Sequence, residues 1–462
     1  MTPTVTVVGA GIAGLGAAHA LQQAGCRTTV LERSRSVGGR MATVSAEGFS
    51  WEPGAHFMWR HYREMIRLCA QLSPPPTLHP VTARAGVLLP DGSIHYFRTD
   101  SPLALLRHPG LTLGDAGRLG LALGRFAARA RSVDPHRPEQ LSRLDDGRSV
   151  LEWGRRAVGS RATDAVLTPA VSSLAFWPPE ETPWWFALGV LALTRQGWFV
   201  PGGGMGEVPA RLARALTVRS GVEVCSVRDL GAGGAVVTSV DSTGRRTEAG
   251  SDAVIVAVPG PVAARLLTDP GGVLGAARAD YLSTATYHRS APITLAYRRS
   301  PERSAYGIAI PVALRRPILA IGWEHLKLPG RNPDGTGVAT VMPASTLVES
   351  HWDSPDEDLV AAARDEVERA YPGSAGQLAF GRVHRWEHAS PRMTPGRYRQ
   401  LAGALAAGQP GRGVFLCGDY WAGPSTEFSL TSGLRAAAEA LAALGRPAPA
   451  SLQRLAGGRV RR

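Results

Sequence analysis

The chain has 462 residues, enough for two domains with full hydrophobic cores. Hydrophobic residues make up 44% and charged residues 19%, which excludes a disordered chain and is ordinary for a globular protein. The formal charge of +13 would suit nucleic acid, but the basic residues are scattered arginines with Lys327 as the only lysine, so we expect no nucleic-acid partner.

The four cysteines, at positions 26, 69, 225 and 417, show no C-x-x-C and no metal-ligand spacing. We therefore expect no metal site and no disulfide framework. No apolar run reaches the roughly 18 residues that a membrane-spanning helix needs. The chain opens directly with a predicted strand and shows no cleavable leader, so we expect a cytoplasmic protein.

The N-terminal stretch has the pattern of a strand–turn–helix–strand unit. A β-branched run at 5–8 predicts the first strand, and an alanine- and leucine-rich stretch from Leu15 to a stop at Gly25 predicts the helix. A second strand is expected over 28–31. The turn between the first strand and the helix reads G-x-G-x-x-G, which is the arrangement that binds a dinucleotide.

The glycines of this motif have separate tasks. Gly9 permits the tight turn, Gly11 lets backbone approach a pyrophosphate at the helix N-terminus, and Gly14 lets helix and strand pack closely. Glu32 ends the second strand, where a carboxylate accepts hydrogen bonds from an adenosine ribose. The candidate cofactor ligands at this end are Gly9, Gly11, Ile12, Ala13, Gly14, Glu32 and Arg33.

The residues after Glu32 indicate which dinucleotide binds. Gly38-Gly39-Arg40 follows at once, and a plain NAD site has no need of it. Two glycines permit close backbone approach, and a guanidinium pairs with phosphate. On these motifs the chain resembles the FAD-dependent amine oxidase superfamily, which includes amine oxidases, protoporphyrinogen oxidases, and carotenoid and squalene-type desaturases. The resemblance implies FAD, with Gly38, Gly39 and Arg40 against its pyrophosphate and ribityl chain.

The resemblance also implies an α/β protein that has a Rossmann-like FAD domain and a second, α+β substrate domain. The FAD domain is expected over 1–75, 215–270 and 376–450. The substrate domain is expected over 76–214 and 271–375, followed by a basic tail over 451–462.

The segment Gly54-Ala55-His56 follows the first FAD motifs. In the superfamily this place passes close to the flavin ring, so Gly54 and Ala55 are candidate cofactor contacts. His56 departs from the pattern. It is either a catalytic or orienting group that titrates near neutral pH, or a structural histidine bonded to backbone.

The first expected substrate segment contains several recognisable patterns. Alternation over 81–97 around a turn predicts a hairpin. The stretch 103–131 predicts a helix whose arginines either face water or meet a membrane surface, and 149–170 predicts another helix. Aromatic residues crowd the stretch 172–210. They either line a channel for a flat or hydrophobic substrate or belong to the core.

Two later stretches return to the cofactor domain and then to the substrate domain. A strand from 222 to 227 and a buried strand over 253–259 are expected in the first. In the superfamily the first of these strands holds adenine by its backbone, which makes Val224 a candidate. Strands over 293–297 and 338–342 belong to the second substrate segment.

The last anchor is a buried strand that ends in Gly418-Asp419 and precedes a helix over 429–444. By resemblance, Asp419 bonds the ribityl or pyrophosphate region. The helix N-terminus faces the flavin, where a positive dipole end stabilises charge on the reduced ring. Candidate residues here are Gly418, Asp419, Thr426, Glu427 and Phe428 for the cofactor, with Tyr420 and Trp421, as aromatic residues on the substrate side, for catalysis.

Two departures narrow the function. Monoamine-type oxidases carry a lysine near flavin N5, but the corresponding strand 293–297 has none, and Lys327 is expected on the surface. The cysteine that tethers flavin in some of them is also missing from 386–393, so we expect non-covalent FAD.

We expect an oxidoreductase that dehydrogenates a small, hydrophobic substrate by hydride transfer to flavin N5, forming a C=C or C=N bond. No Ser-His-Asp order or paired carboxylates stand out, so the hard step belongs to the cofactor. The electron acceptor is O2 or another oxidant. The alternatives are an amine or amino-acid oxidase and, more remotely, an NAD(P)-linked dehydrogenase or a non-catalytic flavin-binding protein.

Overall fold

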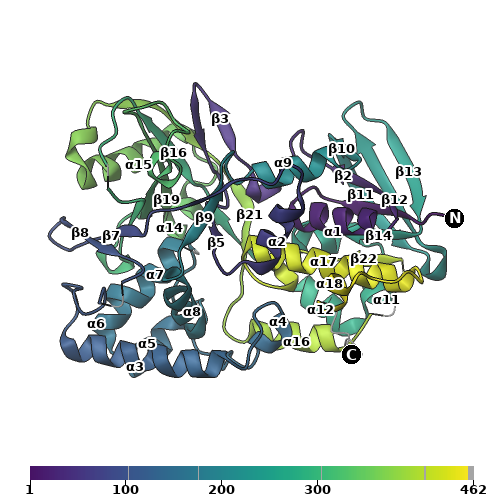
Figure 1. Cartoon of the computed structure of the whole chain (residues 1–462), viewed down its shortest axis with the longest axis horizontal. Coiled ribbons are helices and arrows are strands. Elements are labelled where there is room, and N and C mark those ends of the chain that lie inside the picture. The colour runs from purple at the N-terminus through teal and green to yellow at the C-terminus, as the bar shows by residue number, and fades with distance from the viewer. Residues whose placement is uncertain (102, 175, 303, 410, 412, 456–462) are drawn as a thin grey trace.

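The computed structural model describes residues 1–455 apart from 102, 175, 303, 410 and 412. Two sheets lie in separate parts of the molecule, one toward each end of its long axis (Figure 1). Helices α3 (Leu113–Ala130), α5 (Val150–Ala157), α6 (Ser160–Ala162) and α8 (Trp184–Thr194) gather below the seven-stranded sheet (Figure 1). Helices α1 (Ile12–Gln23) and α17 (Thr426–Ala443) lie against the five-stranded sheet (Figure 1). The arginines of the expected basic tail, from Arg459 to Arg462, lie outside the described residues.

The five-stranded sheet is parallel throughout and joins three distant parts of the chain. Its strand order is β10 (Val218–Ser220), β2 (Arg27–Glu32), β1 (Thr4–Val8), β14 (Ala253–Val256) and β22 (Val414–Leu416). The inner strands are β-branched and buried, as expected where helices cover both faces of a sheet. The predicted α/β, Rossmann-like fold is confirmed.

Helices α1 (Ile12–Gln23) and α17 (Thr426–Ala443) hold the two ends of the chain together. A Cβ added at Gly433 would lie 2.1 Å from the carbonyl oxygen of Ala13, so the two helix backbones are in direct contact. A side chain at position 433 would push the helices apart. This contact brings the N-terminal glycine motif next to the C-terminal segment.

The seven-stranded sheet is mixed and forms the centre of the second part. Its strand order is β20 (Leu378–Val383), β16 (Ile293–Tyr297), β19 (Gly337–Pro343), β18 (Ile318–Trp323), β17 (Gly307–Ala309), β7 (Arg84–Leu88) and β8 (Ile94–Arg98). The pair β7–β8 is the hairpin that alternation predicted. Helix α15 (Asp356–Ala370) covers one face through buried Leu359, Ala363 and Val367.

Two predicted domain boundaries differ from the packing. Strand β20 hydrogen-bonds to β16, so it belongs to the seven-stranded sheet, although the sequence assigned 376–450 to the FAD domain. Helices α11 (Pro270–Leu274) and α12 (Ala276–Ser283) fell in the expected substrate segment. Helix α12 packs instead against α10 (Gly260–Leu266) and α16 (Arg397–Ala406) beside the cofactor sheet. Local sequence could not reveal this, because partners far along the chain decide where each element packs.

The helical layer is more broken than expected. The predicted helix over 103–131 begins only at α3 (Leu113–Ala130), where Thr112 and Asp115 form a capping box. The predicted helix over 149–170 is interrupted at Gly159, whose φ of +92° is unfavourable for other residues. It contains α5 (Val150–Ala157), α6 (Ser160–Ala162), a π-helical turn (Thr163–Leu167) and the start of α7 (Thr168–Leu174).

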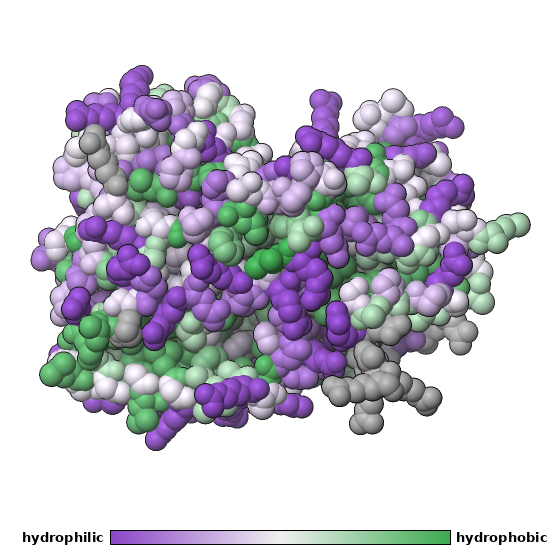
Figure 2. All heavy atoms as spheres, in the orientation of Figure 1, coloured by the Kyte–Doolittle hydropathy of each residue, from purple (hydrophilic) through white to green (hydrophobic). Residues whose placement is uncertain are grey.

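Helix α3 exposes apolar side chains among its arginines. Leu113 is 78% exposed and Leu121 is 56% exposed. Hydrophobic residues gather at the lower left of Figure 2, where Figure 1 places α3 and α6. No helix among the described residues is long and apolar enough to cross a membrane. Peripheral membrane contact through α3 stays a prediction.

A buried polar contact ties α17 to two other segments. The Glu427 carboxylate accepts hydrogen bonds from the backbone N–H groups of Glu64 and Met65, both 2.8 Å, at the start of α2 (Arg63–Gln71). It also lies 2.7 Å from Nε2 of His136. Burial alone would lower the pKa of His136, but the hydrogen bond and charge of Glu427 outweigh it and raise the pKa. The protonated imidazole therefore stabilises the folded chain.

This contact predicts a pH-dependent loss of stability. A histidine whose pKa is raised on folding stabilises fully below its unfolded pKa, and the effect fades as pH rises through the folded pKa. His136→Asn should therefore cost about 1.5–3 kcal/mol of unfolding free energy at low pH, the range for a hydrogen bond to a charged group. The loss should shrink in urea titrations repeated between about pH 5.5 and pH 8.5. Exposed His79→Asn is the control, and a loss that stays constant with pH would contradict this role.

Candidate active site

The glycine turn after β1 fits only glycine at two positions. Gly9 has a φ of +103°, and its N–H donates to the carbonyl of Leu31 at 2.8 Å. A Cβ at Gly9 would lie 2.6 Å from the carbonyl oxygen of Ala257, and one at Gly14 would lie 2.0 Å from that of Gly9. The backbone is therefore packed too closely for any side chain, as the motif predicted.

The N-terminus of α1 is left uncapped. Gly11 is the N-cap residue and supplies no side-chain hydrogen bond, and the first turn contains no acid. A Cβ added at Gly11 would meet no atom within 4 Å, so the space in front of the first-turn N–H groups is open. Residues Ile12, Ala13 and Gly14 form that turn. Free N–H groups at a helix N-terminus, facing an open space, suit a pyrophosphate.

Glu32 stands at the same edge of the sheet. Its carboxylate accepts hydrogen bonds from the backbone N–H groups of Ala10, at 2.7 Å, and Ser34, at 2.8 Å. The Ser34 carbonyl in turn accepts from the N–H of Gly221, which brings β11 (Val222–Asp229) and its Val224 to this edge. Arg33 is exposed beside it. The arrangement suits the adenosine end of a dinucleotide, and the contacts of Val224 and Arg33 with it stay predictions.

The G-G-R segment meets the glycine turn and the C-terminal anchor. Gly38 donates its N–H to the carbonyl of Ala10 at 2.8 Å, and Gly39 lies exposed beside it. Arg40 Nη1 donates to Asp419 Oδ2 at 2.5 Å and to the carbonyl of Ala389 at 2.9 Å. Arg40 therefore joins the first cofactor motif to the last one.

The turn that contains Gly54 and Ala55 closes on the same arginine. Ala55 donates its N–H to the carbonyl of Arg40 at 2.7 Å, and a Cβ at Gly54 would lie 2.1 Å from that oxygen. Trp386 Nε1 donates to the carbonyl of Pro53 at 2.7 Å from β21 (Trp386–Pro391). The structure thus brings together the predicted residues near Arg40, and the open cradle at Gly11 with its flanking acid fits FAD.

Asp419 is buried and satisfied on both oxygens. Tyr287 donates its hydroxyl to Asp419 Oδ1 at 2.6 Å, opposite the bond from Arg40. Gly418 donates its N–H to Ser432 Oγ of α17 at 2.7 Å. The sequence reasoning missed Tyr287, because nothing near it in the chain marks it as a partner of a residue 132 positions away.

The start of α17 differs from the expectation at Glu427. Its side chain is buried and its carboxylate is held by α2 and His136, so a contact of Glu427 with the cofactor would involve its backbone and stays a prediction. Ser425 caps the helix by accepting from the N–H of Phe428 at 3.0 Å. Thr426 Oγ1 is buried without a hydrogen-bond partner among the described residues. Contacts of Thr426 and Phe428 with the cofactor stay predictions.

Tyr420 and Trp421 are both buried in the core rather than exposed in a cleft. The Trp421 ring stacks on the Tyr281 ring with centroids 5.2 Å apart. The Arg397 guanidinium lies over the Tyr281 ring, 3.7 Å from its centroid. This closed stack favours a packing role for Trp421. The Tyr420 hydroxyl has no hydrogen-bond partner among the described residues, so a catalytic role for it stays a prediction.

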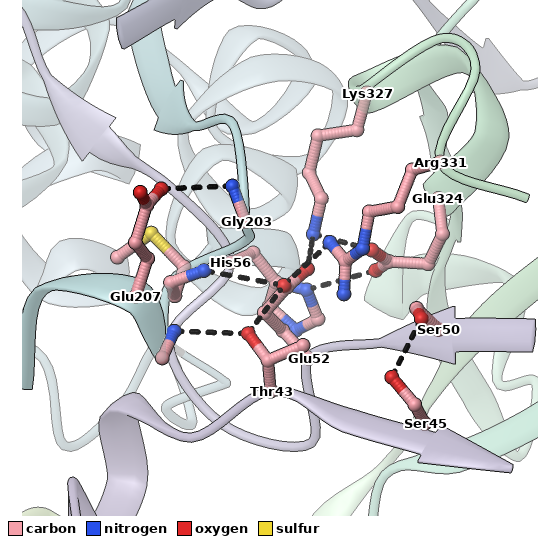
Figure 3. Close-up of polar contacts among 12 residues, drawn as sticks. Thr43, Ser45, Ser50, Glu52, His56, Gly203, Glu207, Glu324, Lys327 and Arg331 are labelled. Atoms are coloured by element: carbon pink, nitrogen blue, oxygen red, sulfur yellow. Dashed lines mark hydrogen bonds and ion pairs between the residues drawn. The ribbon is translucent and has the colours of Figure 1, made fainter. Parts of the chain in front are cut away.

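Lys327 was expected on the surface, and that expectation is wrong. Its side chain is fully buried, and its ammonium group pairs with Glu52 and, at 2.5 Å, with Glu324 (Figure 3). Arg331 Nη1 donates to Glu52 at 2.6 Å. Two cations thus balance two carboxylates in the interior. The sequence did set this residue apart, because Lys327 is its only lysine and all the other Lys or Arg positions are arginine.

The electrostatics of this cluster are asymmetric. Burial raises the pKa of Glu52 above its ordinary value, against the opposing charges of Lys327 and Arg331. Burial acts on Glu324 too, but Lys327 and His56 outweigh it and hold the pKa of Glu324 well below its ordinary value. Glu324 is therefore the ionised partner that faces His56.

His56 lies at the edge of this cluster. Its Nδ1 is 3.4 Å from Glu324 Oε1 (Figure 3), and neither ring nitrogen has a hydrogen-bond partner among the described residues. The backbone-bonded histidine that the sequence offered as one alternative is therefore not what the structure contains. The carboxylate orients the ring and leaves Nε2 unoccupied.

Aromatic residues of the 172–210 stretch contact β21, the strand whose Ala389 carbonyl also accepts a hydrogen bond from Arg40. Trp177 Nε1 donates to Ser390 Oγ of β21 at 3.1 Å, and its ring stacks on Phe186 with centroids 4.9 Å apart. Trp185 lies edge-on to Tyr398 at 5.1 Å. We call Trp177, Trp185, Phe186 and Tyr398 the aromatic wall. Trp177, Trp185 and Tyr398 are buried in the hydrophobic core, which was one of the two alternatives for this stretch, and Phe186 packs against them. Three of the four come from the 172–210 stretch, and nothing in the sequence marked Tyr398.

A dinucleotide fold with an uncapped α1, a G-G-R segment and a buried Gly-Asp defines a flavoprotein of the two-domain oxidoreductase class. Within that class, the profile of the flavin-containing amine oxidoreductase family matches residues 12–441, and the chain belongs to this family. It is a FAD-dependent oxidoreductase. This assignment decides against the NAD(P)-linked and non-catalytic alternatives.

Comparison with individual proteins agrees with this assignment. Mitochondrial protoporphyrinogen oxidase of Nicotiana tabacum is 33% identical over 192 residues, which cover 38% of this chain and 33% of that protein. An L-amino-acid oxidase of Mus musculus is 44% identical over 70 residues, 15% of this chain and 11% of that protein. Both matches span a third or less of the relative's length. The structure of putrescine oxidase bound to putrescine superposes with a TM-score of 0.76 at 18% identity, covering 96% and 99% of the chains, and so shares the fold.

The cofactor site predicts a measurable role for Glu32. Removing a charged hydrogen-bonding partner costs about 1.5–3 kcal/mol, so Glu32→Ala should weaken FAD binding roughly ten- to a hundredfold. Denaturation of a separate sample should first release intact FAD, which shows that the cofactor is non-covalent. The measurement is then a fluorescence titration of the folded apoprotein with FAD. Exposed Glu47→Ala, outside the cofactor motifs, is the control. Unchanged affinity would mean that Glu32 only orders the turn through Ala10 and Ser34.

The buried cluster predicts a large stability effect at Lys327. Lys327→Met leaves two buried carboxylates facing a single cation, and breaking a buried pair in this way costs about 3–5 kcal/mol. Urea unfolding should show this loss. The double variant Lys327→Met/Glu324→Gln should recover part of it, because one charge goes with the other. A loss below about 1 kcal/mol, the scale of a surface pair, would contradict the burial of this cluster.

Proposed function

We propose that this oxidoreductase dehydrogenates a small, flat or hydrophobic organic molecule, with formation of a C=C or C=N bond. The observation that carries the proposal is the position of the aromatic wall. Ser390, which bonds Trp177, follows Ala389, whose carbonyl accepts from Arg40. The wall therefore begins one residue from the contact that closes the cofactor site, and large apolar faces there suit a hydrophobic substrate.

The charged groups beside the wall argue against a cationic amine substrate. Glu181 is a carboxylate that could bind an ammonium group, but Arg392 lies 3.5 Å from it. His288 lies 3.9 Å from Glu181 and has no negative charge to offer an ammonium group. Burial and the nearby charge of Arg392 lower the pKa of His288 to about 3. An incoming ammonium would have to displace Arg392.

Lysine chemistry near the flavin is also hard to reconcile with this chain. Strand β16 is buried throughout and contains no lysine. Lys327 is held between two carboxylates, so its ammonium group is not free to bind a water or a substrate. Both facts favour dehydrogenation of the porphyrinogen-oxidase or desaturase kind over monoamine-type oxidation.

FAD, when bound, supplies the two-electron acceptor. The chain then has to hold the substrate C–H in place, exclude water and accommodate charge. The aromatic wall serves the first two tasks, and the positive end of α17 near Thr426 serves the third. His56 belongs to the turn that contacts Arg40, and Glu324 Oε1 lies 3.4 Å from its Nδ1 and orients the ring.

The test is anaerobic stopped-flow reduction of the FAD-loaded enzyme. A porphyrinogen or another partly reduced hydrophobic ring compound should bleach the flavin, while primary amines, polyamines and amino acids should not. Reoxidation in air with release of hydrogen peroxide would identify O2 as the acceptor. Rapid reduction by an amine or amino acid would instead establish the alternative, an amine or amino-acid oxidase, for which the mouse relative is the supporting observation.

The same measurement on His56→Ala tells how the proton leaves. Loss of a general base lowers the rate roughly 10²–10⁴-fold, whereas loss of an orienting group has a smaller effect. If hydride transfer needs no strong base, reduction should slow only modestly with FAD still bound. A loss in the larger range would make His56 the catalytic base.

A further inference from the structure

One cavity is lined mainly by charged and polar side chains, none of which belongs to the aromatic wall. It has a volume of about 460 Å³ and lies between the start of α2, the 134–137 loop and α18 (Ala450–Gln453). Figure 2 shows hydrophilic residues gathered over the middle of the molecule, where Figure 1 places α2, α4 (Pro138–Leu141) and α18. Its cationic lining residues are Arg63, Arg67, His136, Arg137 and Arg454.

The carboxylates in this cavity do not neutralise its cations. Glu64 accepts from Arg67 at 2.6 Å and from Arg63 at 3.3 Å, so one negative charge faces two positive ones. Asp134 Oδ1 accepts from the backbone N–H of His136 at 3.0 Å and lies 3.3 Å from its Nδ1. The Asp134 carboxylate is therefore engaged by His136.

Two arginines have no acidic partner within the described part of the chain. Neither Arg137 nor Arg454 lies within ion-pair distance of a carboxylate there, and Arg137 Nη2 donates to the carbonyl of Arg454 at 3.4 Å. Four guanidinium groups and the His136 imidazole thus face two lining carboxylates, and Glu427 is a third carboxylate that contacts the imidazole. The excess of positive charge is larger than that of an ordinary solvated ion-pair network, in which the signs balance.

The floor of the cavity is rigid. His136 is only 7% exposed, and its ring is fixed between Asp134 on one side and Glu427 on the other. Glu427 in turn holds the first N–H groups of α2. Because carboxylates engage both nitrogens of His136, a ligand would meet a fixed floor and would bind through the arginines around the rim. A fixed floor reduces the ordering cost of binding.

We propose that this cavity binds a multiply charged oxyanion, of the class of organic phosphates and polycarboxylates, at a site separate from the substrate site. The planar fork of each guanidinium matches the oxygens of phosphate or carboxylate bidentately. Several such forks at different places around one cavity require a ligand with more than one anionic group. The volume lies within the range of small-molecule sites, and the polar lining excludes the hydrophobic substrate class proposed for the aromatic wall.

The test is calorimetric titration of the FAD-loaded protein with inorganic pyrophosphate and, separately, with citrate, at constant ionic strength. Loading with FAD keeps the cofactor's own pyrophosphate site occupied. We expect saturable binding of one probe with a dissociation constant of about 1 mM or tighter. Arg137→Gln/Arg454→Gln should weaken it at least about tenfold, the scale of a lost charged hydrogen bond. The flavin absorbance of the variant verifies that it is folded.

The matched control is Arg125→Gln/Arg299→Gln, which removes the same charge from exposed positions outside the cavity. Binding that the control retains and the cavity variant loses supports the site. A preference for pyrophosphate assigns it to organic phosphates, and a preference for citrate assigns it to polycarboxylates. Equal weakening in both variants would mean attraction to net charge alone. That result, or the absence of saturable heat with either probe, overturns the proposal whatever substrate the enzyme oxidises.

Discussion

Arg40 and Asp419 lie 379 positions apart and form the ion pair on which the rest of the site depends. Arg40 stands beside the glycine turn, and Asp419 lies in the turn that follows β22, the last strand of the cofactor sheet. Tyr287 and Ala389, from the two strands that lead into the second part of the molecule, bond to the same pair. Removing either charge would leave the other partly buried and unpaired, which is far more costly than losing a surface pair. One contact thus fixes the cofactor motifs relative to the aromatic wall.

The Glu52–Lys327–Glu324–Arg331 cluster does similar work on the other side of the cofactor turn. Glu52 precedes that turn, whereas the other three residues follow β18 of the seven-stranded sheet. Because the charges balance, the cluster can be buried, and because Lys327 ends in a compact ammonium it can approach two carboxylates at once. The cluster therefore joins the turn after Glu52 to the seven-stranded sheet while it orients His56 through Glu324. Glu324 thus both pairs with Lys327 inside the cluster and orients His56.

Two groups of side chains suit ligands of different chemistry. The aromatic wall offers stacked rings and a paired acid, which suits a neutral, flat substrate. The cavity near α2 offers uncompensated arginines, which suits an anion. The family assignment determines the cofactor and the class of reaction, but a shared fold does not determine the substrate. The side chains above the conserved scaffold have to decide it.

By itself, the sequence determined what depends on short spacing: the β1–α1–β2 unit, Glu32 at its end, the G-G-R segment and the Gly-Asp anchor. These could be predicted because steric limits on glycine and helix-terminus chemistry act within a few residues. Only the tertiary structure decided the roles of Lys327, Glu427 and His56. The sequence placed Lys327 on the surface and Glu427 at the cofactor, and it left His56 open between a catalytic or orienting group and a backbone-bonded histidine. Their neighbours in the structure come from positions hundreds of residues away. Charge burial and hydrogen bonding over such distances depend on packing, which no local pattern records.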